Sequence, residues 1–438
     1  MLLNAADKAL WRLALPMIFS NITVPLLGLV DTAVIGHLDS PVYLGGVAVG
    51  ATATSFLFML LLFLRMSTTG LTAQAWGAKD PLRLARALVQ PLVLALGAGV
   101  LIIQFRLPLI NLALHIVGGS EAVLEQARRF LEIRWLSAPA SLANLVLLGW
   151  LLGVQYARAP VILLVVGNLL NIVLDLWLVM GLRMNVQGAA LATVTAEYAT
   201  LIIGLMMAKR VLTLRGVSLA MLKNAWRGDM RRLLALNRDI MLRSLLLQLC
   251  FGALTVFGAR LGSDIVAVNA VLMTMLTFTA YALDGFAYAV EAHSGQAYGA
   301  RDGSQLLEVW RAACRQSGMV ALAFALVYSL AGGHIIALLT SLPSLQQLAD
   351  RYLIWQTILP VVGVWCYLLD GMFIGATRGA EMRNSMAVAA AGFAVTLLTV
   401  PVLGNHGLWL ALAVFLALRG LSLALIWRRH WRRGTWFS

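Results

Sequence analysis

The sequence predicts an all-α membrane protein with twelve transmembrane helices, arranged in two six-helix lobes that are related by a parallel internal repeat. Two observations predict this fold. Of the 438 residues, 61% are hydrophobic and only 12% are charged, which is more apolar than a water-soluble core can accommodate. In addition, residues 74–80 (QAWGAKD) return 222 positions later as residues 296–302 (QAYGARD). This self-similarity indicates that one six-helix unit was duplicated.

The apolar segments form twelve spans, each near the roughly twenty residues that a bilayer requires. We predict helices over residues 12–36, 44–72, 86–114, 130–152, 159–181 and 186–208 in the first half, and over 238–260, 265–292, 314–337, 352–376, 385–403 and 406–427 in the second half. The first span starts late and has no small-residue cleavage site after it. We therefore expect a retained helix and not a signal peptide.

Two further residue pairs support the repeat. Pro139 and Pro360 lie 221 positions apart, and Gly153 and Gly375 lie 222 apart. Because six helices separate each position from its copy, both halves are expected to insert in the same direction. We predict an N-terminal lobe, a cytoplasmic linker and a C-terminal lobe over residues 1–212, 213–236 and 237–438.

The net charge of +14 lies mainly between the spans. With the N-terminus inside, the inner segments hold about 24 Lys and Arg residues and the outer segments about 6, so both termini are expected to be cytoplasmic. The basic linker is expected to meet anionic membrane lipids. No basic stripe with exposed aromatic residues accompanies the charge, so we do not expect nucleic-acid binding.

Charged side chains inside the spans are the candidate functional residues, because a charge in hydrocarbon is costly and is retained where it is paired, hydrated or used. Asp31 is the sole charge between Leu13 and Gly36, and its helix contains Pro16 and Pro25, which weaken helical hydrogen bonding. We predict that Asp31 couples transport to a proton or cation and that the prolines form a hinge. An aspartate that only reaches water at the helix end is the alternative.

A polar stripe marks the fifth predicted span. Asn168, Asn171 and Asp175 are three and four residues apart, which places them on one helix face. If this stripe only held helices together through hydrogen bonds, the two amides would be sufficient. The additional carboxyl group therefore favours the interpretation that the stripe lines a polar cavity. We predict that Asp175 shares the coupling role with Asp31, and that the two asparagines line a cavity together with Asn144.

The second half carries different acids. The positions 222 residues after Asp31 and Asp175 hold no acid, whereas Asp284 lies in the eighth span and Asp370 lies in the tenth, near Tyr367. We expect these three C-terminal residues to line the cavity as well. Duplicated lobes with unlike acids indicate divided roles.

Other functions lack their motifs. No phosphate-binding Gly-x-x-x-x-Gly-Lys-[Ser/Thr] stretch, nucleophile elbow or zinc-protease motif occurs. The six histidines are scattered, and the three cysteines lie far apart in or beside apolar segments. We therefore expect no enzymatic activity, no cofactor and no metal site.

These features together resemble the multidrug and toxic compound extrusion (MATE) family, and within it the branch of DNA-damage-inducible F-like proteins. The similarity rests on the proline-flanked Asp31, the stripe that ends at Asp175, and the repeated Gln-Ala-aromatic-Gly-Ala motif. It implies an antiporter that exports bulky amphipathic or cationic small molecules by alternating access. It further implies coupling to H⁺, with Na⁺ as the other possible ion, in a monomer of the bacterial inner membrane. The branch with a coupling glutamate in the seventh helix is not matched, since that helix offers only Gln248.

A flippase for a lipid-linked or amphiphilic substrate is the alternative function. Such a protein needs a cationic cavity to hold pyrophosphate, and therefore several buried basic residues. Within or near the spans we single out Arg65, Arg134 and Arg419 as the candidates for such a cavity. The acidic character of the buried charge favours the antiporter.

Overall fold

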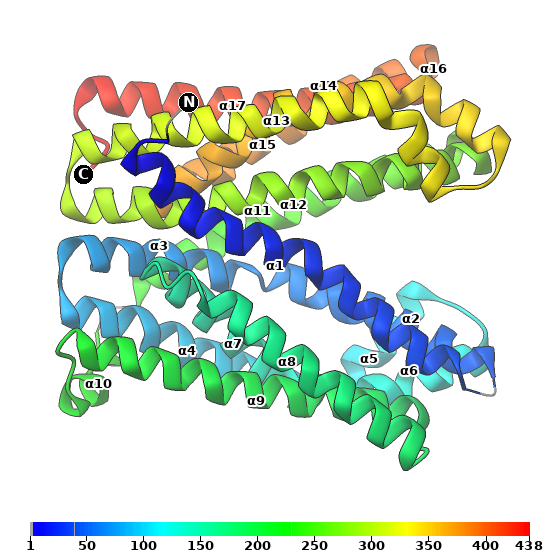
Figure 1. Ribbon diagram of the computed structural model, residues 1–438, viewed down its shortest axis with the longest axis horizontal. Coiled ribbons are helices and arrows are strands. Elements are labelled where there is room, and N and C mark those ends of the chain that lie inside the picture. Colours follow the sequence, from blue (N-terminus) through cyan, green and yellow to red (C-terminus); the bar gives the residue numbers. More distant parts are fainter. Residues whose placement is uncertain (1–2, 39, 229) are drawn as a thin grey trace. The chain divides into compact units, whose positions relative to one another are not determined.

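The computed structural model describes the backbone of residues 3–38, 40–228 and 230–438, and the side chains of the same residues except 24–33 (Figure 1). Every regular element in these ranges is helical, which confirms the predicted all-α class. Eleven helical segments among the described residues are long and apolar enough to cross a bilayer. The helix α1 (Ala5–Gly36) covers the first predicted span.

The chain forms two compact units. We call residues Phe19–Leu233 the N-unit, and the residues up to Ile18 together with Leu234–Ser438 the C-unit. The N-unit contains the second part of α1 and then α2 (Pro41–Leu60), α3 (Phe63–Ala78), α4 (Pro81–Gln104), α5 (Arg106–Val117), α6 (Glu121–Arg134), η1 (Trp135–Ser137), α7 (Ala138–Gly153), α8 (Ala159–Asp175), η2 (Leu176–Gly181), α9 (Asn185–Leu214) and α10 (Leu219–Ala225).

The C-unit contains the first part of α1 and the remaining helices. These are α11 (Arg231–Leu261), α12 (Ser263–Ala300), α13 (Gly303–Leu339), α14 (Pro343–Gly375), α15 (Gly379–Thr396), η3 (Leu397–Thr399), α16 (Val400–Leu403) and α17 (Asn405–Arg433). The lobe boundaries predicted at residues 212 and 237 stay a prediction. The compact units differ from them in that the start of α1 belongs with the second half.

Prolines explain where two predicted spans are interrupted. The span predicted over 86–114 is divided at Phe105, between α4 and α5. Pro108 lacks an amide hydrogen, and its ring would clash with the carbonyl of Gln104 in a continuous helix. Similarly, η1 interrupts the span predicted over 130–152 immediately before Pro139. Its counterpart Pro360 instead lies inside the continuous helix α14.

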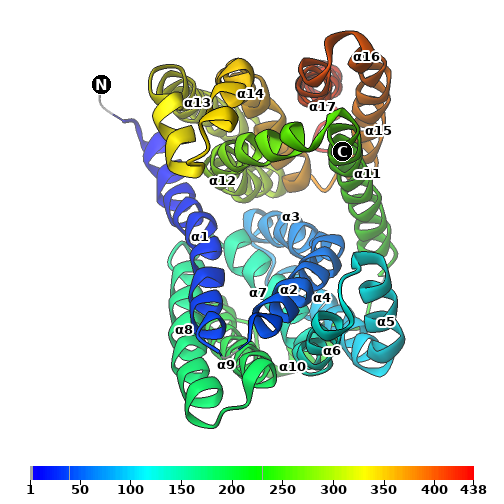
Figure 2. The ribbon, with the colours of Figure 1, turned by 90° about the vertical axis from the view of Figure 1, so that its right-hand side faces the viewer.

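One central helix organises each unit. In the N-unit α7 packs against α3, α4 and α9, and in the C-unit α14 packs against α12, α13 and α17 (Figure 2). In the segments Glu121–Gly153 and Pro343–Gly375, the most apolar 18-residue stretch is 72% buried in each case. Trp150 on α7 is fully buried and donates to the Leu84 carbonyl at 3.1 Å.

The duplication is visible in local geometry. Helix α3 ends with Lys79 at φ 54° and ψ 39°, and α12 ends with Arg301 at φ 54° and ψ 38°. The next residue in each half, Asp80 or Asp302, caps the following helix by accepting hydrogen bonds from backbone amides. The same turn chemistry therefore recurs 222 residues apart.

The central helices also approach their neighbours closely at equivalent glycines. A Cβ added at Gly153 would lie 2.7 Å from Thr72 Cβ, and one added at Gly375 would lie 2.8 Å from the Gly295 amide nitrogen. Gly371 would place a Cβ 2.7 Å from the Ala287 carbonyl oxygen. These positions require glycine because two helix backbones meet there, α3 with α7 and α12 with α14.

The start of α1 is attached to helices that are made much later in the chain. Trp11 Nε1 donates to Gln316 Oε1 at 2.9 Å, and Arg315 forms an ion pair with Asp7 at 2.9 Å. The carbonyl of Ala9 lies 3.2 Å from His293 Nε2. These contacts hold the first turns of α1 within the C-unit.

Candidate functional site

A polar cavity lies within the N-unit, and we call it the N-unit cavity. Its volume is about 500 Å³, and it is lined mainly by α7, α8 and α9. Three predicted residues, Asn144, Asn168 and Asn171, all line it. The structure thus brings together amides that are separated in sequence by up to 27 residues. Apolar side chains such as Leu163 complete the lining, so the cavity offers both polar and apolar surface.

The carboxylate of Glu197 lies at this cavity, and sequence analysis did not single it out. Its Oε1 accepts from Arg134 Nη2 at 3.0 Å, and its Oε2 lies 3.5 Å from Arg134 Nη1. Ser141 also donates to this carboxylate. Asn144 Nδ2 donates to the backbone carbonyl of Glu197 at 3.1 Å. The network connects α6, α7 and α9 around one negative charge that its arginine partner balances.

The polar stripe of α8 continues from the cavity toward Asp175. Asn171 accepts a hydrogen bond from Thr193 of α9 at 3.4 Å. Asp175 is not among the residues that line the cavity, although it is only one turn further along the same face, and it is 1% exposed. The helix changes to a π-helix, η2, directly after Asp175. Such irregular turns are frequent at functional sites.

The predicted hinge and the first acid lie on α1. The side chains of Pro25 and Asp31 are outside the described residues. The helix itself runs without interruption from Ala5 to Gly36, and Pro16 is half-buried within it. The hinge and the coupling role of Asp31 stay predictions.

The acids predicted in the second half belong to a separate cluster in the C-unit. Asp370 on α14 is 7% exposed and accepts from Arg243 Nη2 of α11 at 2.6 Å. Arg419 of α17 contacts the same carboxylate oxygen. Asp284 lies on α12 and Tyr367 on α14, and these two helices pack against each other. The structure therefore holds Asp370 between two arginines, within an arrangement that connects α11, α14 and α17.

The two units differ in which residue their last long helix contributes to a buried or half-buried ion pair. The last long helix of the N-unit contributes the acid Glu197 to its ion pair, whereas the last long helix of the C-unit contributes the base Arg419. Arg243, which lies inside the span predicted over residues 238–260, is 6% exposed. The expectation that the duplicated halves have different roles stays a prediction.

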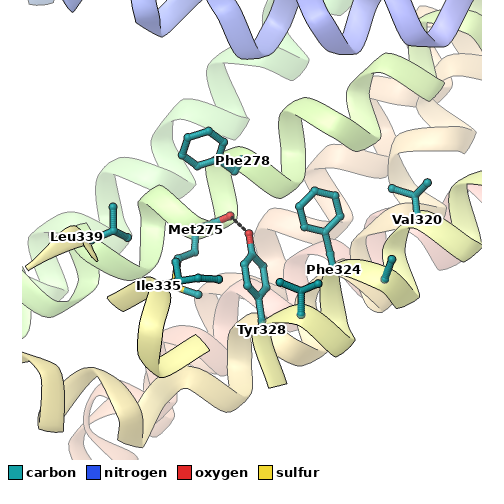
Figure 3. A pocket seen from close by; sticks show the side chains of 9 residues that line it. Met275, Phe278, Val320, Phe324, Tyr328, Ile335 and Leu339 are labelled. Carbon is teal, nitrogen blue, oxygen red and sulfur yellow. Dashed lines mark hydrogen bonds between the residues drawn. The ribbon is translucent and has the colours of Figure 1, made fainter. Parts of the chain in front are cut away.

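A second cavity, of about 460 Å³, lies between α12 and α13 and has an apolar lining (Figure 3). Its one hydroxyl group belongs to Tyr328, which donates to the Met275 carbonyl at 2.8 Å. None of the predicted site residues lines this cavity. Among the described residues, its lining contains no charged side chain, so this cavity has no group that could bind the coupling ion.

Within the described ranges, no group of three His, Cys, Asp or Glu side chains is arranged to hold a metal ion. The groups at the N-unit cavity are amides, hydroxyls, a carboxylate and a guanidinium. These groups bind and orient polar or cationic molecules by hydrogen bonding and charge.

Comparison with known proteins gives a consistent result. The MatE family model matches residues 16–177 and 240–404, one stretch in each half. DNA damage-inducible protein F of Escherichia coli (strain K12) is 86% identical over 436 residues, covering 100% of this chain and 95% of that protein. Protein DETOXIFICATION 45, chloroplastic, of Arabidopsis thaliana is 26% identical, covering 98% of this chain and 79% of that protein.

The fold also matches solved structures. A crystal structure of MATE in the bent conformation has a TM-score of 0.84 at 23% identity, and one in the straight conformation has 0.82 at 22% identity. Both alignments cover 98% of this chain and 96% of the other. The predicted membrane fold is therefore confirmed.

Proposed function

The chain belongs to the MatE family, and we propose that it is a proton-coupled antiporter that exports bulky amphipathic or cationic compounds by alternating access. Family membership makes the chain a multi-pass membrane transporter and confirms the expectation that it is not an enzyme. The observation that carries the finer proposal is the N-unit cavity of about 500 Å³. This volume is in the range of small-molecule binding sites.

The lining of the cavity supports the proposed substrate class. Asn144, Asn168 and Asn171 offer carbonyl oxygens, so a cationic group finds acceptors on α7 and α8. The Glu197 carboxylate of α9 lies at the same cavity, where Arg134 balances its charge. Leucine side chains of α7 and α8 line the same space. A molecule with one polar or charged part and one apolar part therefore fits both surfaces.

Coupling is assigned to Asp31 and Asp175. A carboxyl group carries a proton or releases it, so its charge depends on which side of the membrane it faces. Asp175 supports this role through its burial and its position one turn beyond Asn171. In the proposed cycle a proton from outside neutralises the acid, the first helix bends at Pro16 and Pro25, and the cavity shrinks and releases its substrate. Relatives of this fold have been crystallised in conformations called bent and straight.

The alternative function, a flippase, requires several buried basic groups that are free to bind pyrophosphate. The structure adds Arg243 to the buried arginines expected from sequence. However, Arg243 and Arg419 both engage Asp370, and Arg134 engages Glu197. Guanidinium groups that are held by carboxylates are poorly suited to bind pyrophosphate, so the antiporter is the better-supported function.

The proposed setting is the inner membrane of a bacterial cell, in which the protein acts as a monomer with both termini in the cytoplasm. The excess of Lys and Arg in the inner segments supports this orientation.

The test is flux into or out of proteoliposomes that contain the full chain. An imposed proton gradient, an imposed sodium gradient and no gradient are compared for a lipophilic cation, a neutral amphipathic compound and a lipid-linked pyrophosphate. Uphill movement of the cation with the proton gradient alone is the expected result. Movement of the lipid-linked compound without any gradient would favour the flippase. Export of the cation driven by the sodium gradient would show that Na⁺, and not H⁺, is the coupling ion.

A further inference from the structure

The last two turns of α17 carry four exposed arginines on one face. Arg428, Arg429, Arg432 and Arg433 follow one another at spacings of one, three and one residues, so they share a side of the helix with Leu425. Together these five residues line a depression of about 350 Å³. We call this set the arginine face.

The arginine face differs from the arginines of the chain that are paired with a carboxylate. In the part of the chain that the structure describes, no carboxylate lies within ion-pair distance of these four side chains. Arg134, by contrast, has its own carboxylate partner. His430, on another side of the same turns, is bound to Glu381 at 3.0 Å. Four positive charges therefore gather at one place without a protein anion to balance them.

The helix below the arginine face is apolar on the same side. Leu425 is 56% exposed and Leu421, one turn earlier, is 57% exposed. At a rise of about 1.5 Å per residue, Leu421 lies roughly 10 Å along the axis from Arg428. An exposed apolar strip thus leads directly into a cationic end, which matches the order of acyl chain and headgroup in a phospholipid.

The neighbouring side of α17 supplies aromatic anchors. Trp427 and Trp431 stack with ring centroids 5.5 Å apart, and Trp310 of α13 lies 6.1 Å from Trp427. Indole rings prefer the boundary between hydrocarbon and headgroups. They fix the depth of these turns in the bilayer and so bring the arginine face to the level of lipid phosphates.

The C-terminal residues hold the end of α17 in place. Arg378 Nη2 donates to the carbonyls of Thr435 and Trp436 at 2.9 and 2.8 Å, and Trp436 is 2% exposed. Because the last turns are anchored through the residues that follow them, the four arginines are presented by a fixed helix end and not by a loose tail.

We propose that the arginine face is a binding site for an anionic phospholipid with two headgroup phosphates. Arginine pairs with phosphate oxygens through two parallel hydrogen bonds, so two arginines can serve each phosphate. The acyl chains then lie along Leu425 and Leu421. This site is separate from the N-unit cavity and does not depend on the transported substrate.

The test measures lipid binding to the delipidated full-length protein by native mass spectrometry. Cardiolipin, phosphatidylglycerol and phosphatidylcholine are titrated in turn as probes. The test variant replaces Arg428, Arg429, Arg432 and Arg433 by glutamine. The matched control replaces Lys209, Arg210, Lys223 and Arg227, four exposed basic residues of the N-unit, by glutamine. Both variants lose four positive charges.

We expect the wild type and the control to bind one cardiolipin with equal affinity, and the test variant to bind it at least about tenfold more weakly, since one basic side chain near an anionic lipid contributes roughly fivefold. If the test variant binds cardiolipin as tightly as the wild type, the arginine face is not the binding site. If the control variant loses as much affinity as the test variant, the attraction is a diffuse one to positive charge and not a site. Phosphatidylglycerol binding as tightly as cardiolipin would overturn the two-phosphate assignment. If the fourfold variant does not fold, the pair Arg428→Gln and Arg432→Gln gives the same test.

Discussion

Replacing Glu197 by glutamine tests whether its ion pair with Arg134 organises the N-unit cavity. The shorter of the two contacts is 3.0 Å, and the Arg134 and Glu197 side chains are 12% and 24% exposed. Glutamine keeps the size of the side chain and one carbonyl oxygen. It leaves the guanidinium without its counter-charge. We therefore expect a folded but less stable protein in which the cavity binds cationic compounds more weakly.

The expected loss follows from the partial burial of the pair. An exposed ion pair contributes up to about 1 kcal/mol, whereas breaking a fully buried pair costs about 3–5 kcal/mol. The Arg134–Glu197 pair lies between these limits, so we expect a loss of about 2 kcal/mol for Glu197→Gln and a similar loss for Arg134→Gln. The double variant should lose little more than either single one. This corresponds to a coupling free energy of about 1.5 kcal/mol between the two side chains.

The coupling is measured by a double-mutant cycle, from the unfolding of the purified protein in detergent. The exposed pair of Arg129 and Glu125, one turn apart on α6 with a contact of 3.3 Å, provides the control cycle. It should give no more than about 0.5 kcal/mol. A coupling for Arg134 and Glu197 as small as that of the control pair would refute the reasoning, as would unchanged export of a lipophilic cation by Glu197→Gln.

Four further predictions concern the proposed coupling groups, the hinge and the C-unit cluster. Asp31→Asn should leave the protein inserted and monodisperse but abolish gradient-driven export in proteoliposomes; pumping at the wild-type rate would remove Asp31 from the mechanism. Asp175→Asn should reduce coupled flux more than Asp284→Asn at equal expression, and the opposite order would move the coupling site to the C-unit. Asp370→Asn should lower the free energy of unfolding by about 3 kcal/mol, because two buried arginines lose their shared counter-charge; a loss below about 1 kcal/mol would contradict the buried cluster. Pro16→Ala should slow drug flux while thermal stability stays equal or rises, since proline is unfavourable inside a helix; unchanged flux would exclude this proline as a hinge.

Local sequence signals predicted the fold and part of the cavity. The all-α membrane class follows from composition and span length. The repeated motif at residues 74–80 predicted a duplication, and the dihedral angles of Lys79 recur almost unchanged at Arg301. The spacing of Asn168 and Asn171 predicted a shared face, and both line the same cavity. Helical periodicity is a local property, so one stretch of sequence is enough to predict it.

Glu197 was missed although a signal for it exists. It is the only charged residue between Arg183 and Lys209, which is the same criterion that singled out Asp31. Its pairing with Arg134, 63 residues earlier, depends on how α6 and α9 pack.

The cluster around Asp370 depends even more on tertiary structure. Its arginine partners lie 127 and 49 residues away in sequence, and no local pattern connects them. Arg243 lies inside the span predicted over residues 238–260, but sequence analysis did not count it among the buried arginines, because the helix that contains it, α11, carries several basic residues in its first turns. The depth at which such a helix is buried is decided by its neighbours and not by its own composition.

The attachment of the first turns of α1 to the C-unit has a consequence for biogenesis. Trp11 leaves the ribosome early, whereas its partner Gln316 is made 305 residues later. At about 5–20 residues per second, this interval lasts roughly 15 to 60 seconds. During that time the start of α1 has none of its final neighbours from α12 and α13, and it must remain in the translocon or the lipid without them. A segment that enters the membrane well before α12 and α13 is therefore among the last to reach its native contacts, and translation sets the earliest moment at which the C-unit can be completed.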